Sequence, residues 1–312
     1  MVTLKDIVAG HNRIRPFIHR TPVLTNKSLD ELSGAYIFFK CENFQKAGSF
    51  KIRGATNTVE LLSEDELDRG IATTSSGNHG AALSMAVARR GGKTKVVMPN
   101  NTSKIKVDNV KRNGGEVVWC KPDQSSREEV LTKLVEETGA IVVHPYNDER
   151  IVAGQGTCTK ELIEDYPDLD VIISPVSGGG LLSGTLLAAK GLNPKIMVYG
   201  AEPSEADDAY RSLQKGEIVG NNTIDTICDG LRAQIGTVTF PIIQRHVDDI
   251  MTVTESEIIE AMKMVWERMK IIAEPSSVIT LGALLKNKNM FSGKKVGLIL
   301  SGGNVDLEHL PW

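Results

Sequence analysis

Asn43-Phe44-Gln45-Lys46-Ala47-Gly48-Ser49-Phe50-Lys51-Ile52-Arg53-Gly54-Ala55 is the stretch around which the chain is organised, because it sets Lys51 behind small residues and an aromatic ring. A lysine that loses its proton near neutral pH is a nucleophile, and its natural product with a carbonyl compound is a Schiff base. Lysines beside an arginine, here Arg53, more often belong to a solvated face, so this stretch alone does not make Lys51 catalytic. Further Gly/Ser loops downstream favour the catalytic interpretation.

Length and composition narrow the class of protein. At 312 residues the chain exceeds the usual size of a single core, so two domains are expected. The sequence is 41% hydrophobic and 24% charged, and its formal net charge is −3. Because no basic stripe or charge block stands out, neither nucleic acid nor a membrane is an expected partner.

Cysteine usage bears on the compartment. The four cysteines lie far apart and form no CxxC pair, which argues against a zinc site or a disulfide framework and fits a reducing compartment. The chain starts with a polar, amphipathic segment rather than a basic and then apolar leader, and it contains no run of about 18 apolar residues. We therefore expect a cytoplasmic protein.

Short apolar strands alternate with helices from Gly70 to His144, which predicts a parallel sheet covered on both faces. The last half of the chain repeats the pattern. The expected fold class is α/β with two open parallel-sheet domains, the small one (66–145) inserted in the large one (1–65 and 146–312). Strands are expected at 36–40, 70–74, 95–99, 116–119, 140–143, 171–173, 196–199 and 296–300, and helices include 4–18, 103–112, 126–138, 182–190 and 255–269.

The segment Ser177-Gly178-Gly179-Gly180-Leu181 follows an apolar strand and opens a helix. Glycines let a ligand approach the backbone, and the helix N-terminus supplies free amides, so this pattern favours a phosphate site. A flexible turn is the simpler alternative. The segment lacks the Lys-Ser/Thr ending of a P-loop and the spacing of a dinucleotide fingerprint, so ATP hydrolysis and NAD binding are both less expected as functions.

Two more polar loops end predicted strands. In Ser75-Ser76-Gly77-Asn78-His79-Gly80, hydroxyls and amides would suit a substrate carboxylate, and Asn78 could bond a cofactor oxygen. The serines could instead be helix N-caps. Ser301, at the tip of the last strand, could reach a bound heterocycle, although Ser-Gly-Gly is also an ordinary strand exit.

Taken together and in this order, these motifs resemble the fold-type II pyridoxal 5'-phosphate (PLP) enzymes of the serine/threonine dehydratase family, essentially from end to end. Within that family the chain is similar to the serine racemases and to the hydroxyaspartate dehydratases. The motifs are 48–55, 75–80, 154–157, 177–180 and 301–304 for the family, 201–204, 206–208, 265–270 and 303–307 for the racemases, and 156–158, 208–212 and 310–312 for the dehydratases.

The resemblance implies roles for individual residues. Lys51 would hold PLP as a Schiff base, Phe50 would pack on its ring, Asn78 would bind the ring hydroxyl and Ser301 the pyridine nitrogen. The phosphate would lie on Ser177, Gly178, Gly179, Gly180 and Leu181. The substrate would face Ser75, Ser76, His79 and Arg127. Two departures from the racemase pattern are Ser177, where glycine is usual, and Ala233, where some racemases carry a serine near the substrate carboxylate.

The resemblance also implies a divalent cation held by Glu202, Asp208 and the backbone carbonyl of Ala206. Such hard oxygen ligands suit Mg²⁺, Ca²⁺ or Mn²⁺. From spacing alone, 202–208 would instead be a solvated acidic turn. A homodimer is expected by the same resemblance, and a nucleotide activator is a further possibility it leaves open.

The implied activity is racemisation of serine together with dehydration of L-serine and D-serine to pyruvate and ammonia. Lys51 would be the base on one face of the substrate, and Ser76 would act on the other. The nearest alternative is a hydroxyaspartate or threonine dehydratase (ammonia-lyase), also acting on a small hydroxy-amino acid. The alternative outside this class is a non-catalytic protein that binds a phosphate-bearing ligand.

Overall fold

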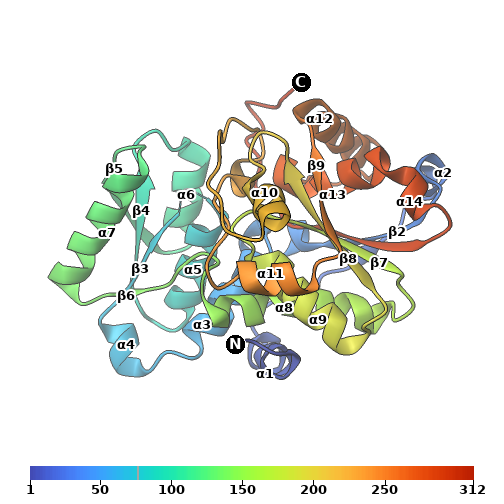
Figure 1. The fold of residues 1–312 in the computed structure, drawn as a ribbon. Coiled ribbons are helices and arrows are strands. Elements are labelled where there is room, and N and C mark those ends of the chain that lie inside the picture. The colour runs from blue at the N-terminus through green and yellow to red at the C-terminus, as the bar shows by residue number, and fades with distance from the viewer. Residues whose placement is uncertain (76) are drawn as a thin grey trace.

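The computed structural model describes residues 1–75 and 77–312 and contains two separate sheets (Figure 1). The six-stranded sheet is parallel except for its first strand, which pairs antiparallel with its neighbour. In spatial order its strands are β1 (Val23–Leu24), β2 (Tyr36–Cys41), β10 (Lys295–Leu300), β7 (Val171–Pro175), β8 (Met197–Pro203) and β9 (Asp249–Val253). The four-stranded sheet is entirely parallel, in the order β5 (Gly115–Cys120), β4 (Thr94–Pro99), β3 (Ile71–Thr74) and β6 (Ile141–Val142).

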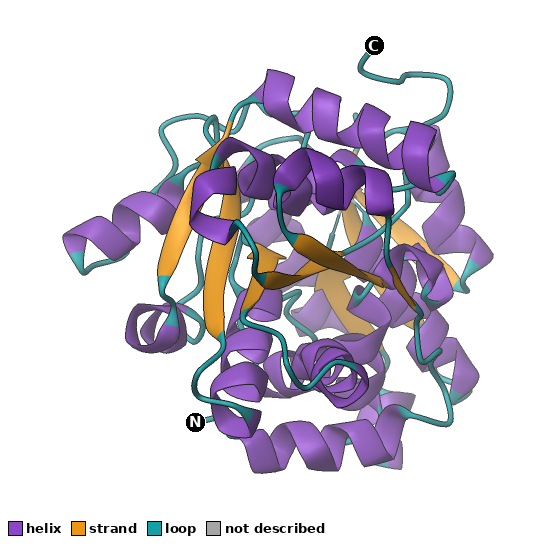
Figure 2. Ribbon diagram, turned by 90° about the vertical axis from the view of Figure 1, so that its right-hand side faces the viewer, coloured by secondary structure: helices purple, strands orange, loops and turns teal. Residues whose placement is uncertain are grey.

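Helices cover both sheets, and Figure 2 shows them on both faces of the strands. Around the four-stranded sheet lie α4 (Glu64–Asp68), α5 (Asn78–Arg89), α6 (Lys104–Arg112) and α7 (Gln124–Thr138). The other helices are α1 (Leu4–Ile14), α2 (Lys27–Ser33), α3 (Lys51–Val59), α8 (Glu149–Asp165), α9 (Gly180–Leu192), α10 (Asp208–Lys215), α11 (Phe240–His246), α12 (Glu255–Met264), α13 (Pro275–Lys286) and α14 (Lys288–Phe291). Short turns η1 (Glu42–Phe44), η2 (Lys46–Gly48), η3 (Asp229–Leu231) and η4 (Val265–Met269) complete the fold.

Strand β7 explains why the large sheet is buried on both faces. All five of its residues are buried. Its side chains alternate, so Val171 and Ile173 join one apolar core with residues of α12 and α13, whereas Ile172 joins another with residues of α8 and α9. A continuous apolar run is therefore what this strand requires. The expected fold class, two parallel-sheet domains of α/β type, is confirmed.

Most expected bounds agree with the structure to within about two residues, and four places differ, the first being β8, which runs to Pro203 rather than ending at 199. β1 and β9, which the sequence did not predict, are the two edge strands. β1 has only two residues, too few to show a pattern, and polar residues such as Asp249 interrupt the pattern of β9. Helix α1 ends at Ile14 rather than near 18. Arg15 still has helical backbone angles, but Pro16 has no N–H to continue the helical hydrogen bonds. The helix expected over 255–269 is α-helical to Met264 and continues as the π-helical turn η4.

The domain boundaries remain a prediction. All four strands of the small sheet lie within 66–145, and both parts of the remaining chain contribute strands to the large sheet. Within the described residues, no helix is long and apolar enough to span a bilayer.

Candidate active site

Lys51 is the first residue of helix α3, and its half-buried side chain points its amine at the backbone of another segment. Nζ donates a hydrogen bond of 2.8 Å to the carbonyl of Pro145 and lies 5.2 Å from the centre of the Phe50 ring. Burial lowers the pKa of Lys51 from 10.5 to about 8. An appreciable fraction of this amine is therefore unprotonated near neutral pH, as a nucleophile requires.

The turn before Lys51 depends on residues with little or no side chain. Ala47 and Gly48 have φ angles of 56° and 74°. A Cβ atom at Gly48 would lie 2.3 Å from Oδ1 of Asn304, so only glycine fits there. The turn is held from the C-terminal loop, because Asn304 donates to the carbonyl of Ala47 (2.8 Å) and Phe50 N donates to Ser301 O (3.0 Å).

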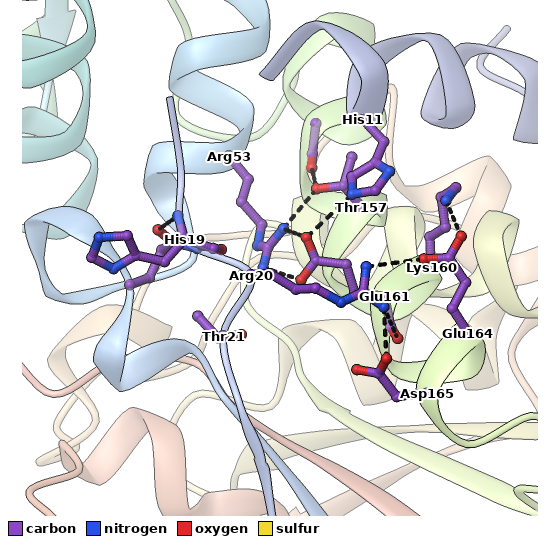
Figure 3. A network of polar contacts seen from close by, with 12 residues as sticks. His11, His19, Arg20, Thr21, Arg53, Thr157, Lys160, Glu161, Glu164 and Asp165 are labelled. Atoms are coloured by element: carbon purple, nitrogen blue, oxygen red, sulfur yellow. Dashed lines mark hydrogen bonds and ion pairs between the residues drawn. The ribbon is translucent and has the colours of Figure 1, made fainter. Parts of the chain in front are cut away.

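A buried network of charges fixes helix α3 two residues after Lys51 (Figure 3). Arg53 pairs with Glu42 (2.7 Å) and Glu161 (2.8 Å), and Lys40 pairs with Glu161 (2.7 Å); all four side chains are at most 1% exposed. Two basic and two acidic groups compensate one another, as buried charges must. Arg53 therefore does not belong to a solvated face. The network ties α3 to α8, β2 and η1.

The glycine loop between β7 and α9 has the shape of an anion cradle. Gly179 has a φ of 89°, and a Cβ atom at Gly178 would lie 2.4 Å from the ring of Tyr146. The first amides of α9, which begins at Gly180, lack intrahelical acceptors. These features fit the phosphate group of PLP.

The two departures from the racemase pattern contact each other. Ser177 Oγ donates to the carbonyl of Ala233 and accepts from its N–H, both at 3.0 Å. The Ser177 hydroxyl thus joins the glycine loop to the segment where the substrate carboxylate was expected. Its own role toward the phosphate can then rest only on its backbone.

In the loop after β3, the Ser75 hydroxyl holds the start of α5, although Gly77 occupies the N-cap position. The Ser75 Oγ accepts hydrogen bonds from the N–H groups of Gly77 (3.2 Å) and Gly80 (3.0 Å). Ser76, the expected second catalytic residue, lies outside the described residues. His79 is buried with Nε2 3.3 Å from the carbonyl of Val143, and burial, followed by the charge of Lys51, lowers its pKa to about 3. Ser75 and His79 remain candidate substrate contacts.

Asn78 lies where three of the predicted loops meet. Its amide nitrogen donates to Glu274 (2.8 Å), and its amide oxygen accepts from Asn304 (2.9 Å). Ser301, which directly follows strand β10, is buried, and its hydroxyl lies 3.5 Å from the carbonyl of Ser276. Because Ser301 also accepts from Phe50, the structure brings the Lys51, Asn78 and Ser301 loops together.

Arg127 remains a predicted substrate contact, and Glu274 is a residue of the site that the sequence did not predict. Arg127 donates to the carbonyl of Pro122 in its own segment (3.4 Å), and within the described residues it forms no hydrogen bond with Lys51 or Asn78, so its substrate role stays a prediction. Glu274 was not predicted at all. It is buried at the start of α13, and burial followed by the charge of Asp229 raises its pKa to about 8. No local sequence signal marks it, because its partner Asn78 is 196 residues away.

Glu202 and Asp208 form a buried carboxylate pair rather than a solvated turn. Burial, and then the neighbouring Asp208 charge, raises the pKa of Glu202, while burial raises the pKa of Asp208 to about 6. Asp208 Oδ1 is buried without a hydrogen-bond partner among the described residues. Two adjacent acids with an unused oxygen fit a divalent cation, with the carbonyl of Ala206 as the third expected ligand. In residues 1–75 and 77–312 no group of three or more His, Cys, Asp or Glu side chains forms a metal site.

Comparisons with known proteins show the family to which the chain belongs. Residues 14–302 match the family described as pyridoxal-phosphate dependent enzyme. The chain is 51% identical over 313 residues to serine racemase of Dictyostelium discoideum (99% of this chain, 97% of that protein). It is 48% identical over 310 residues to β-hydroxyaspartate dehydratase of Paracoccus denitrificans (99% and 98%). Its fold matches the solved structure of maize serine racemase with a TM-score of 0.96 at 44% identity (98% and 95%). The chain is therefore a member of the pyridoxal-phosphate dependent enzyme family.

Proposed function

We propose that this enzyme racemises serine and also dehydrates L-serine and D-serine to pyruvate and ammonia. The observation that carries the proposal is the convergence of three loops at the Lys51 amine. Phe50 N donates to Ser301 O, Asn304 of the same loop donates to Asn78, and burial lowers the pKa of Lys51. Relatives of this chain at about half identity over nearly their whole length include serine racemases. Since its family is one of enzymes, the non-catalytic alternative has no support.

PLP bound at this site would withdraw electrons from the substrate and make its Cα–H acidic. We propose that Lys51 holds the cofactor and takes the Cα proton on one face, while Ser76 returns a proton on the other. Asn78 would bind the ring oxygen and Ser301 the pyridine nitrogen, and a neutral hydroxyl at that nitrogen favours departure of a β-hydroxyl. The amides of 177–181 would bind the phosphate.

The surrounding residues would select the substrate and exclude water. Ser75 Oγ accepts from two loop amides, so it orients the loop, whereas neutral His79 and Arg127 are the proposed side-chain contacts to the substrate. A divalent cation, Mg²⁺ or its alternatives Ca²⁺ and Mn²⁺, would be held by Glu202, Asp208 and the carbonyl of Ala206. A cytoplasmic homodimer, and activation by a nucleotide, complete the proposal.

Dehydration of hydroxyaspartate is the second candidate function. It is favoured by the 48% identity to a β-hydroxyaspartate dehydratase that covers 98% of that protein. Both candidates need the same base and cofactor, and they differ in whether a second proton donor acts. Threonine dehydration shares the same chemistry, and the fold matches a threonine deaminase at 39% identity.

A substrate panel separates these activities. Purified holoenzyme is incubated with L-serine, D-serine, L-threonine and the hydroxyaspartate isomers, and products are separated by chiral chromatography. We expect D-serine and pyruvate from L-serine. Borohydride should remove the yellow colour of the holoenzyme and leave the reduced cofactor covalently attached to Lys51. Fast hydroxyaspartate dehydration without serine racemisation would replace the first function by the second, and a colourless protein that binds no PLP would refute both.

A further inference from the structure

We propose that Glu274 and Asn304 are positioning residues that fix the orientation of the Asn78 side-chain amide in the PLP site. The inference rests on the proposed role of Asn78 as the residue that meets the ring oxygen of the cofactor. It gives roles to two residues for which the sequence predicted none. It also states which end of the Asn78 amide faces each of them.

The orientation begins at a backbone carbonyl, which cannot exchange its donor and acceptor ends. Nδ2 of Asn304 donates to the carbonyl of Ala47 (2.8 Å) and also to Oδ1 of Asn78 (2.9 Å). An amide nitrogen carries two hydrogens, so these contacts use both of them. Turning the Asn304 amide over would place its oxygen against the Ala47 carbonyl oxygen. The Asn304 donor is therefore fixed toward Asn78.

Asn78 is then fixed from both sides. Its Oδ1 accepts from Asn304, and its Nδ2 donates to Oε1 of Glu274 at 2.8 Å. A flipped Asn78 amide would set nitrogen against nitrogen on the Asn304 side and would remove the N–H that Glu274 accepts. Only one orientation satisfies both neighbours. It leaves the second N–H of Nδ2 to donate to an oxygen of a bound ligand.

The Glu274 side chain forms its hydrogen bond with Asn78 and not with its own helix. It stands at the N-cap of α13, yet its side chain makes no capping hydrogen bond. Its carboxyl group is buried. Gly302 makes room for it, since a Cβ atom there would lie 2.5 Å from Oε1. A side chain so placed is explained by its contact with Asn78.

Glutamine is the conservative replacement for Glu274. A buried acid whose pKa is raised to about 8 is largely neutral near neutral pH, and the amide of glutamine keeps an acceptor oxygen of similar reach. Alanine removes that acceptor. The pair Glu274→Gln and Glu274→Ala therefore separates the presence of an acceptor from the bulk and charge of the side chain.

The test is a double-mutant cycle on PLP affinity. Apoprotein variants are titrated with PLP alone, and the Kd is read from the absorbance of bound PLP. We expect Glu274→Ala and Asn304→Ala each to raise the Kd about tenfold, the effect of losing one oriented hydrogen bond, and Glu274→Gln to stay within about twofold of the parent. In an Asn78→Ala background, Glu274→Ala should cause no further change, and Asn304→Ala should cause a smaller loss than in the parent, because Asn304 also holds the Ala47 carbonyl.

Additive losses in the Asn78→Ala background would overturn the inference, since a merely structural role would weaken PLP binding independently of Asn78. An unchanged Kd in both Glu274→Ala and Asn304→Ala would overturn it as well. If Glu274→Ala fails to fold, the Asn304 and Asn78 cycle decides the question alone. Glu308→Ala, which removes an exposed acid in the segment that follows Asn304 in the sequence, is the matched control and should leave the Kd unchanged. A parent protein that binds no PLP would refute the proposed function, whereas additivity in a PLP-binding parent refutes only the positioning.

Discussion

Lys106 on helix α6 forms an ion pair with Asp229 in turn η3, and this contact joins the half of the molecule built on the small sheet to the half built on the large one. The two side chains are 27% and 30% exposed. Lys106 also approaches the loop after β3, because a Cβ atom at Gly77 would lie 4.0 Å from its Cδ. The pair thus bridges the two halves next to the loop that carries Asn78.

We expect the small domain to close over bound substrate, because a site between two domains has to exclude water from the reaction. Lys106→Ala should raise the KM for serine several-fold and change kcat by less than about twofold, while a partly exposed pair contributes only about 0.2–1 kcal/mol to stability. Steady-state kinetics and thermal melting check this. Lys104→Ala, an exposed lysine on the same helix, is the control. Equal KM values in the two variants would contradict the bridging role.

The lowered pKa of Lys51 predicts how cofactor loading depends on pH. Only the unprotonated amine attacks a carbonyl, so the loading rate of apoprotein with PLP should rise with pH up to about 8 and then level off. A lysine with the ordinary pKa of 10.5 would give a rate that still rises above pH 9 or so. Absorbance stopped-flow measures the profile. Lys51→Ala should show neither the bound-PLP band nor turnover, and turnover by that variant would refute the assignment.

The same shift affects the stability of the apoprotein. The folded pKa of Lys51 is about 8 and the unfolded value is 10.5, so between these values the unfolded chain binds more protons. The contribution of Lys51 to the free energy of unfolding must therefore increase as pH rises through this window. Urea unfolding across the window should show the free energy of unfolding of the parent rising with pH relative to that of Lys51→Met. A constant difference would mean that Lys51 titrates normally.

Removal of divalent cations should lower both the melting temperature and the affinity for PLP. Asp208 Oδ2 accepts from the N–H of Ile235 (2.7 Å), and the next residue, Gly236, donates to the carbonyl of Gly178 in the glycine loop (3.2 Å). A cation present at 100 times its Kd adds about 2.7 kcal/mol to stability. Melting curves and PLP titrations in EDTA, Mg²⁺ and Ca²⁺ test this. Asp208→Asn should respond less than the parent, and identical curves in all three buffers would remove the cation from the proposal.

The buried network around Arg53 should dominate the stability of the Lys51 helix. Arg53→Met leaves Glu42 and Glu161 buried without their main cation, and breaking a buried pair in this way costs about 3–5 kcal/mol. Arg20→Met is a matched control, because Arg20 is 47% exposed and pairs with surface acids, so its loss should cost less than about 1 kcal/mol. Urea unfolding measures both. Similar costs would show that the network contributes no more than surface pairs.

The sequence predicted what is local and missed what depends on distant contacts. Strand β7 and the glycine loop after it could be predicted, because an apolar run, glycines and a helix start lie within a dozen or so residues, the scale on which periodicity works. The burial of Arg53 could not be, because its partner Glu161 lies 108 residues away and lysine-arginine segments are usually exposed. Glu274 was missed for the same reason. The carboxylates Glu202 and Asp208 read locally as a solvated turn, and only the packing of β8 and α10 buries them.

Ser76 decides between a racemase and a simple dehydratase, and its role is predicted from the sequence because it lies outside the described residues. Dehydration of an L-substrate needs only proton removal on the Lys51 side and loss of the β-hydroxyl, whereas inversion needs a proton donor on the opposite face. Ser76→Ala should therefore abolish racemisation of L-serine and dehydration of D-serine while leaving measurable dehydration of L-serine.

Chiral chromatography and a pyruvate assay on the same samples measure the three activities of Ser76→Ala together. Ser75→Ala serves as the control, since it removes the hydroxyl that accepts from Gly77 and Gly80 and should reduce all three activities in parallel. An unassisted serine is a weak acid, so the Ser76 hydroxyl would need help from the cofactor phosphate or water, and the loss should be close to complete. Racemisation by Ser76→Ala at the parental rate would exclude Ser76 as the donor, and uniform losses like those of Ser75→Ala would assign it to loop structure instead.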